Sequence, residues 1–299
     1  RSEQKNSSLI ADFSLTTGYK SSLSNNKNSI SHIFTKYDVD LDLSNFESSK
    51  MNFFLEKVSN DTYLKVFDTS LMETEIKPSN PNKLNTGMKL ILDHKNYNFD
   101  MGLNIYENLQ EGKSSDRYEY VFPYYNFSRL IDIDRLGLLE FSSSGSNKLK
   151  NTNSLTTLIN NNLNFITKDF ISFNGIINNL GFYFKNTNKV GKKVSTLKNS
   201  PQVNLMNIIN FESKYPLIKI DENHYNSLIP KLSFRINPTD MKNYKNEDRK
   251  INTNNIFSIN RLGLDDTFEE GKSLTLGFDF KKESLNDINK FFKFKIASV

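Results

Sequence analysis

The sequence predicts an all-β fold, in which one antiparallel up-and-down sheet of the β-barrel type forms a large curved meander. Apolar and polar residues alternate in many short segments along the 299 residues. Because successive side chains of a strand point to opposite sides, this alternation gives each strand one apolar and one polar face. Phe (24) and Tyr (13) are abundant, whereas Gly (12) and Pro (7) are few, as strands favour. All-β units of this length are common, so we expect a single domain over residues 1–299.

Segments of period 2 occur from one end of the chain to the other. They cover residues 10–16, 37–44, 51–58, 63–67, 88–93, 97–106, 118–130, 138–141, 163–167, 232–236 and 274–280. A strand with its connection takes roughly 17 to 20 residues if each strand spans a bilayer, which gives on the order of 14 to 18 strands. A sheet of that size is expected to curl or close.

Polar stretches with turn residues separate these segments, at residues 21–29, 77–86, 110–117, 142–154, 185–202 and 237–255. Their mixed lengths are typical of a barrel with tight turns at one rim and longer loops at the other. Helix is expected only as a turn or two at 69–76 and 284–292. Pro123, inside an aromatic segment, predicts an edge, a bulge or a strand end, because proline cannot donate to the ladder.

The most regular pattern lies in residues 254–280, which we interpret as strand, polar turn and strand. The second strand predicts a lipid-facing row made of Leu274, Leu276, Phe278 and Phe280. Thr275, Gly277 and Asp279 fall on the opposite face. A polar lumen behind such a wall gives four lumen-facing candidates, namely Asp40, Asp42, Arg235 and Asp279. The same alternation also occurs in half-buried sheets of soluble proteins.

Signs of covalent chemistry are missing from the sequence. There is no phosphate-binding glycine loop, no nucleophile elbow and no His-Glu pair at helical zinc spacing. The chain has no Cys, and its three His residues are far apart. Asp40 and Asp42 could act as an acid/base pair on a sugar, although one polar strand face explains them equally well. We therefore expect no enzyme activity, no catalytic residues, no cofactor and no metal.

The net charge of +5 and the pI near 9.0 permit an anionic partner. The basic residues are mostly dispersed, and the alternating Phe and Lys of residues 291–295 fit a strand better than a base-stacking surface. We therefore expect no nucleic acid among the partners. Lipid and lipopolysaccharide stay compatible with this charge.

One stretch carries a recognisable order of residues: Asn255, Phe257, Ser258, Arg261, Gly263, Asp265 and Gly271. It resembles the signature of the LptD (organic solvent tolerance) family of lipopolysaccharide-assembly proteins. Residues 61–65, 116–123 and 228–235 look similar to the same family. The resemblance implies a β-barrel in the outer membrane of a Gram-negative cell. It also implies a lipopolysaccharide translocon that performs no covalent chemistry, holds an LptE-like lipoprotein plug and is fed by the periplasmic Lpt bridge.

The chain also departs from that family. The periplasmic jelly-roll domain and the final barrel strands are not present in residues 1–299, and the family's cysteines and girdle tryptophans are missing. Asp266 stands where many relatives have Arg. We therefore expect residues 1–299 to be a fragment of the barrel domain. Two alternatives remain open: a porin-like passive channel, and a soluble β-rich binding protein or adhesin whose apolar face packs on a second sheet.

Overall fold

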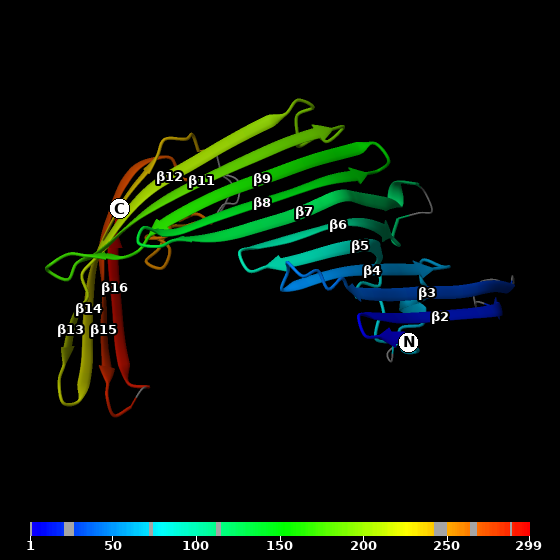
Figure 1. Ribbon diagram of the computed structural model, residues 1–299, viewed down its shortest axis with the longest axis horizontal. Coiled ribbons are helices and arrows are strands. Elements are labelled where there is room, and N and C mark those ends of the chain that lie inside the picture. Colours follow the sequence, from blue (N-terminus) through cyan, green and yellow to red (C-terminus); the bar gives the residue numbers. More distant parts are fainter. Residues whose placement is uncertain are drawn as a thin grey trace. The chain divides into compact units, whose positions relative to one another are not determined.

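The computed structural model describes residues 2–20, 27–71, 74–111, 115–241, 250–263, 268–287 and 289–299. These residues form one 16-stranded sheet, and neighbouring strands follow the order of the chain (Figure 1). Only β10 and β13 leave this path, pairing with β11 and β14. The order begins at β1 and ends at β16, so the described strands form an open meander and not a closed barrel. The predicted all-β, up-and-down fold is confirmed.

Most of the strands are long, with 11 to 16 residues in each of the main ones. The first half of the chain contains β1 (Ser2–Gln4), β2 (Ser7–Lys20), β3 (Lys27–Asp40), β4 (Ser48–Val58), β5 (Lys83–His94), β6 (Tyr97–Asn108), β7 (Tyr118–Ile133) and β8 (Gly137–Lys150). The second half contains β9 (Ser154–Thr167), β10 (Phe170–Ile171), β11 (Ile177–Lys192), β12 (Gln202–Lys214), β13 (Leu217–Ile220), β14 (His224–Asn237), β15 (Gly271–Ser284) and β16 (Phe291–Ser298). The described helices are the short α1 (Tyr63–Val66) and the 3-10 turn η1 (Ser115–Arg117).

The chain divides into two compact units. Unit 1 comprises residues 1–129, 142–160 and 188–203, and unit 2 comprises residues 130–141, 161–187 and 204–299. The division runs through β7, β8, β9, β11 and β12 and does not fall in a linker. This agrees with the absence of any change in composition along the sequence.

In unit 1, strands β2 to β6 lie side by side in chain order (Figure 1). The connection after β4 forms α1 and packs on one face of these strands. It brings Tyr63, Leu64 and Leu71 into a buried cluster around Phe34, which is 0% exposed. The core of this unit is therefore small, and it lies at one end of the strands.

In unit 2, β14 and β15 form a ladder that runs without a register shift from His224↔Ser284 to Asn237↔Gly271. Strand β16 pairs with the other edge of β15. The described parts of the connection between β14 and β15 are irregular. They are attached to β15 through Arg261, whose guanidinium donates to Ser273 Oγ at 2.8 Å.

The structure corrects several expected elements. Residues 63–67 were predicted as a strand, but 63–66 form α1, because the apolar positions 63, 64 and 67 also fit one side of a helical turn. Residues 254–259 were predicted as a strand and instead form turns. The described residues of 69–76 and 284–292 are not helical. The polar stretches 142–154 and 185–202 were predicted as connections, yet β8 and β11 extend into them, and β12 was not predicted.

The predicted irregularity at Pro123 is confirmed as a bulge. The register between β6 and β7 shifts there, since Gly102 pairs with Tyr124 whereas Asn104 pairs with Val121. Among the residues that the structure describes, no helix is long and apolar enough to cross a membrane.

Candidate functional site: the two faces of the sheet

The apolar face of unit 2 consists of rows that continue from strand to strand. In the register, Phe234 lies opposite Leu274, and Leu232 lies opposite Leu276. Further along, Phe278 pairs with Ile296 and Phe280 with Phe294. Leu274 and Leu276 are each 50% exposed, although both are mid-strand residues. All four lipid-facing candidates thus lie on one continuous apolar face.

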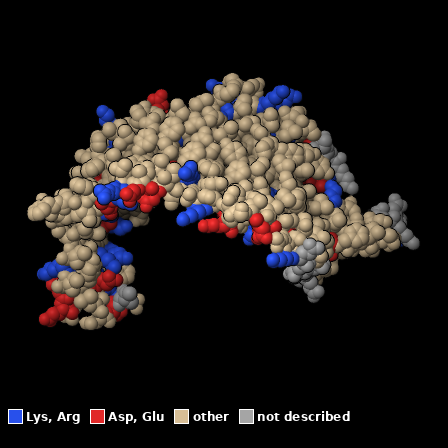
Figure 2. Space-filling view, in the orientation of Figure 1, with Lys and Arg blue, Asp and Glu red and all other residues tan. Residues whose placement is uncertain are grey.

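Unit 1 has a similar apolar face. Phe13 of β2 pairs with Ile33 of β3, and both are exposed. Tyr37 of β3 pairs with Phe53 of β4, and their rings stack with centroids 6.3 Å apart. Figure 2 shows that uncharged residues occupy most of the visible surface of the long strands, while charged residues gather in small groups. The cross-strand pairs of β2, β3 and β4 therefore form apolar rows on this face.

The length of the apolar rows matches a bilayer. Every second one of the nine residues from Leu228 to Ile236 of β14 is apolar. A strand that crosses a bilayer at a tilt of about 45° takes about 9 to 11 residues. Strands of 14 residues, such as β14 and β15, also exceed the typical 5 to 6 residues of strands in soluble proteins.

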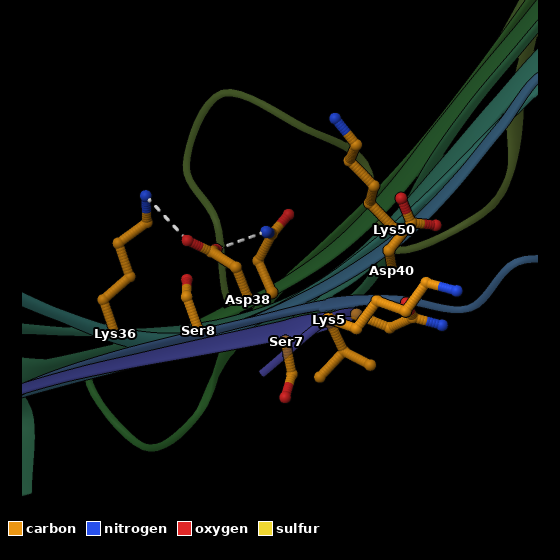
Figure 3. Close-up of a pocket in the computed structure, with 10 residues that line it drawn as sticks. Lys5, Ser7, Ser8, Lys36, Asp38, Asp40 and Lys50 are labelled. Carbon is orange, nitrogen blue, oxygen red and sulfur yellow. Dashed lines mark hydrogen bonds and ion pairs between the residues drawn. The ribbon is translucent and has the colours of Figure 1, made fainter. Parts of the chain in front are cut away.

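The polar face of unit 1 carries a cavity of about 500 Å³. Figure 3 shows Lys36, Asp38 and Lys50 on one side of the strands and Ser7 on the opposite side. Lys36 Nζ lies 3.1 Å from Asp38 Oδ2, and Asn52 Nδ2 donates to Asp38 Oδ1 at 2.6 Å. The cavity therefore contains both signs of charge, with Asp38 held in place by two neighbours.

Two of the lumen-facing candidates lie near this cavity. Asp40 is exposed, lines the cavity and lies opposite Lys50 in the register. Asp42 was expected on the same strand face, but β3 ends at Asp40. Asp42 has a left-handed backbone with φ of 48°, and its carboxylate accepts a hydrogen bond from Asn6 Nδ2 at 2.5 Å. It is a turn residue and not a member of the polar strand row.

The polar face of unit 2 contains two buried arginines that share one glutamate. Arg261 Nε lies 2.9 Å from Glu269 Oε2, and Arg235 Nη1 lies 3.6 Å from the same oxygen. Arg235 Nη2 and Asn237 Nδ2 both donate to the backbone carbonyl of Glu269 at 2.9 Å. These contacts fix Glu269 and the residues around Arg261 against β14 and β15. Arg235, a lumen-facing candidate, is only 4% exposed and is therefore covered.

The fourth lumen-facing candidate, Asp279, is also engaged. Its carboxylate pairs with Lys231 of the neighbouring strand. The Lys231 ammonium in turn lies 5.8 Å from the ring centroid of Phe257. Asp279 thus helps to hold a second residue of the 250–263 segment close to the polar face.

The residues of the family-like motif are mainly structural in this arrangement. Asn255 Oδ1 accepts from the backbone N–H of Asn252 at 2.7 Å, and Asn255 Nδ2 donates to the Lys250 carbonyl at 3.0 Å. Gly263 and Gly271 have φ of 62° and 90°, which favours glycine. Asp265 lies outside the described residues. The motif therefore builds a folded segment, in which Arg261 makes the main attachment to the sheet.

Unit 1 attaches its own connection in a comparable way. Arg117 Nη2 lies 2.9 Å from both Asp61 Oδ1 and Glu107 Oε1, and its side chain is 5% exposed. The hydrogen bond to Asp61 raises the pKa of the Arg117 guanidinium from its ordinary value. Residues 116–123 stood out in the sequence for their similarity to a known family. No pattern in these residues predicted the ion pair of Arg117.

A second buried contact lies under the same connection. His32 Nδ1 is 2.8 Å from the Tyr63 hydroxyl, and His32 Nε2 is 3.3 Å from Asp12 Oδ1. Burial raises the pKa of the Tyr63 hydroxyl. Asp12 also accepts from Thr74 Oγ1 at 2.7 Å. The sequence showed only that the three His residues are far apart along the chain, and it offered no sign that His32 would join these elements.

The sequence matches no known protein-family model and no curated protein. Within the described part of the chain, no group of three or more His, Asp or Glu side chains is placed to hold a metal ion. The features that bear on function are therefore the continuous apolar face and the charged, partly covered polar face.

Proposed function

We propose that this chain forms part of the wall of an outer-membrane β-barrel that delivers lipopolysaccharide to the outer leaflet. The observation that supports this proposal most directly is the set of exposed apolar rows on long strands whose opposite face is charged. Leu274 and Leu276 are half exposed, whereas Thr275 between them is 2% exposed on the polar side. A bilayer accounts for such apolar exposure, because lipid tails cover it.

The hydrogen bonding of the sheet fits the same environment. A strand can cross a membrane only if its backbone N–H and C=O groups are paired with neighbouring strands. Strand β15 is paired on both edges, with β14 along all 14 of its residues and with β16 along part of it. On the other face, polar side chains suit water and hydrated sugars, since an unpaired charge on apolar surface is costly.

The assignment to lipopolysaccharide rests on the resemblance to the LptD family. The residues that carry it, above all Arg261, hold a segment on the polar face of β15. If the assignment holds, the partners of this chain are an LptE-like lipoprotein plug, the periplasmic Lpt bridge and outer-membrane lipid. The substrate moves without a change in its covalent bonds.

Photo-crosslinking at two adjacent positions tests this proposal. Asn52 and Phe53 follow each other in β4 and lie at the same depth on opposite faces. In cells that supply lipopolysaccharide, a photo-reactive residue at 53 should capture phospholipid, and one at 52 should capture lipopolysaccharide. Arg235 is unsuitable for this purpose, because it is covered.

The outcomes separate the alternatives. Capture of phospholipid at 53 without lipopolysaccharide at 52, together with free passage of small solutes, would favour a passive channel. Capture of neither lipid, with the protein in the aqueous fraction, would favour a soluble β-rich binding protein. Either result rejects the proposal.

A further inference from the structure

The cavity on the polar face of unit 1 has an unusual set of lining residues. Lys5, Lys36 and Lys50 supply three positive charges, and Asp38 and Asp40 supply two negative ones. The remaining lining residues are Asn6, Ser7, Ser8, Val39 and Asn52. Among the described lining residues only Val39 is apolar and none is aromatic. Its volume of about 500 Å³ falls within the range of small-molecule sites, about 300 to 1,000 Å³.

This composition selects one class of ligand. Lysine ammonium groups bind phosphate as compact point charges. The Asp38 carboxylate, already oriented by Lys36 and Asn52, can accept hydrogen bonds from hydroxyl groups. A lipid tail would find only one apolar side chain there, Val39, and a nucleic-acid base would find no ring to stack on. A hydroxyl-rich molecule with a phosphate group satisfies both kinds of side chain.

The cavity also lies at a particular end of the strands. It is next to the turn between β1 and β2 and the connection between β3 and β4, residues 5–6 and 41–47. At the other end, the connections between β4 and β5 and between β6 and β7 are longer. In outer-membrane barrels the short turns face the periplasm. The cavity is thus at the end where a substrate from the periplasm arrives first.

We infer that this cavity, built by Lys36, Asp38, Asp40, Lys50 and Asn52, binds a phosphorylated sugar. The inference rests on the proposed function for the source of that sugar, which is the phosphorylated sugar portion of lipopolysaccharide. Lys36 and Lys50 contact the phosphate, and Asp38 with Asn52 contacts sugar hydroxyl groups. The site selects arriving substrate by charge and hydroxyl content, before any contact with the apolar face.

Calorimetric titration of the intact protein in detergent micelles provides the test. The probes are glucosamine 1-phosphate, glucosamine and inorganic phosphate. We expect glucosamine 1-phosphate to bind more tightly than inorganic phosphate, and glucosamine to bind least. The double variant Lys36→Gln/Lys50→Gln should weaken the binding of glucosamine 1-phosphate by about tenfold or more, because each lost charged hydrogen bond is worth at least that factor.

Lys219→Gln/Lys290→Gln is the matched control, since it removes the same charge from two side chains that are each 78% exposed in unit 2. The control should bind like the parent protein. If both double variants weaken binding equally, or if neither does, the site is refuted. If inorganic phosphate binds as tightly as glucosamine 1-phosphate, the site is a simple anion site and the sugar assignment is refuted.

A second variant covers the case in which the double variant does not fold. Ser8→Trp keeps every charge but fills the cavity, so it should abolish binding of glucosamine 1-phosphate while the protein stays folded. Unchanged binding would contradict the site. Failure here is distinct from failure of the proposed function, which is read from lipid capture at residue 53 and lipopolysaccharide capture at residue 52. The apolar face can contact lipid even if the cavity binds no sugar.

Discussion

Replacement of Leu276 by arginine gives the sharpest test of what covers the apolar face. Leu276 lies near the middle of β15 and is 50% exposed. If this position faces lipid near the bilayer midplane, Leu276→Arg should lower the free energy of unfolding by about 2 to 4 kcal/mol. If it faces water instead, the same change should stay within about 0.5 kcal/mol, as at other exposed sites.

The assay is a urea unfolding titration of the intact protein in phospholipid vesicles, followed by tyrosine fluorescence. Leu285→Arg serves as the control, because Leu285 is the same residue type with 52% exposure but lies in the turn after β15. Near an interface an arginine costs about 0 to 1 kcal/mol. If the two variants lose the same stability, the apolar face does not contact lipid and the reasoning is wrong.

Thr275→Arg is not a neutral control for the opposite face. Thr275 is 2% exposed, and its hydroxyl lies 3.5 Å from Arg261 Nη1. A second guanidinium would be forced against Arg261 in a buried site. We therefore expect Thr275→Arg to be destabilising too, in contrast to what simple alternation predicts.

Three further predictions concern the two faces of β4 and the buried side chains of Arg117 and Arg261. Phe53→Arg should destabilise the protein in vesicles by about 2 to 4 kcal/mol, whereas Asn52→Arg, beside the Asp38 carboxylate, should cost less than about 1 kcal/mol; equal losses in unfolding titrations would contradict the two-faced strand. Arg117→Ala should lower the free energy of unfolding by about 1 to 3 kcal/mol, because it removes a buried guanidinium that bonds Asp61 and Glu107, and unchanged stability would reject that role. Arg261→Ala should speed hydrogen exchange and proteolysis in residues 250–263 without affecting β2 to β4, and unchanged protection would show that this side chain does not hold the segment.

The sequence predicted strands most accurately where the two faces of a strand differ most in polarity. In β15 the alternation of Leu274 to Phe280 is strong, and the structure has a strand there, in which exposed Leu274 and Leu276 flank buried Thr275. Strand β8 was missed beyond residue 141, because its sequence SSSGSNKLK has no apolar period. Such a polar strand is stabilised by the ladders on its two sides, and those come from neighbours that a local pattern does not include.

The segment 254–259 shows a different reason for failure. It alternates like a strand, but Asn252 and Asn255 use their side chains to bond nearby backbone groups. These local hydrogen bonds compete with a ladder and favour turns. The irregular backbone then lets Arg261 reach Glu269 and Ser273, contacts between residues that no sequence period relates.

The four lumen-facing candidates illustrate what a polar face does once the connections fold onto it. Arg235 is covered by contacts to Glu269, Asp279 is paired with Lys231, and Asp42 has left the strand for a turn. Asp40 lies on its strand and lines an open cavity. Alternation therefore identifies which residues lie on the polar face of a strand, but the folded connections decide which of them are open to solvent. Buried arginines hold those connections in place. The open part of the polar face therefore has a defined shape and a defined set of side chains.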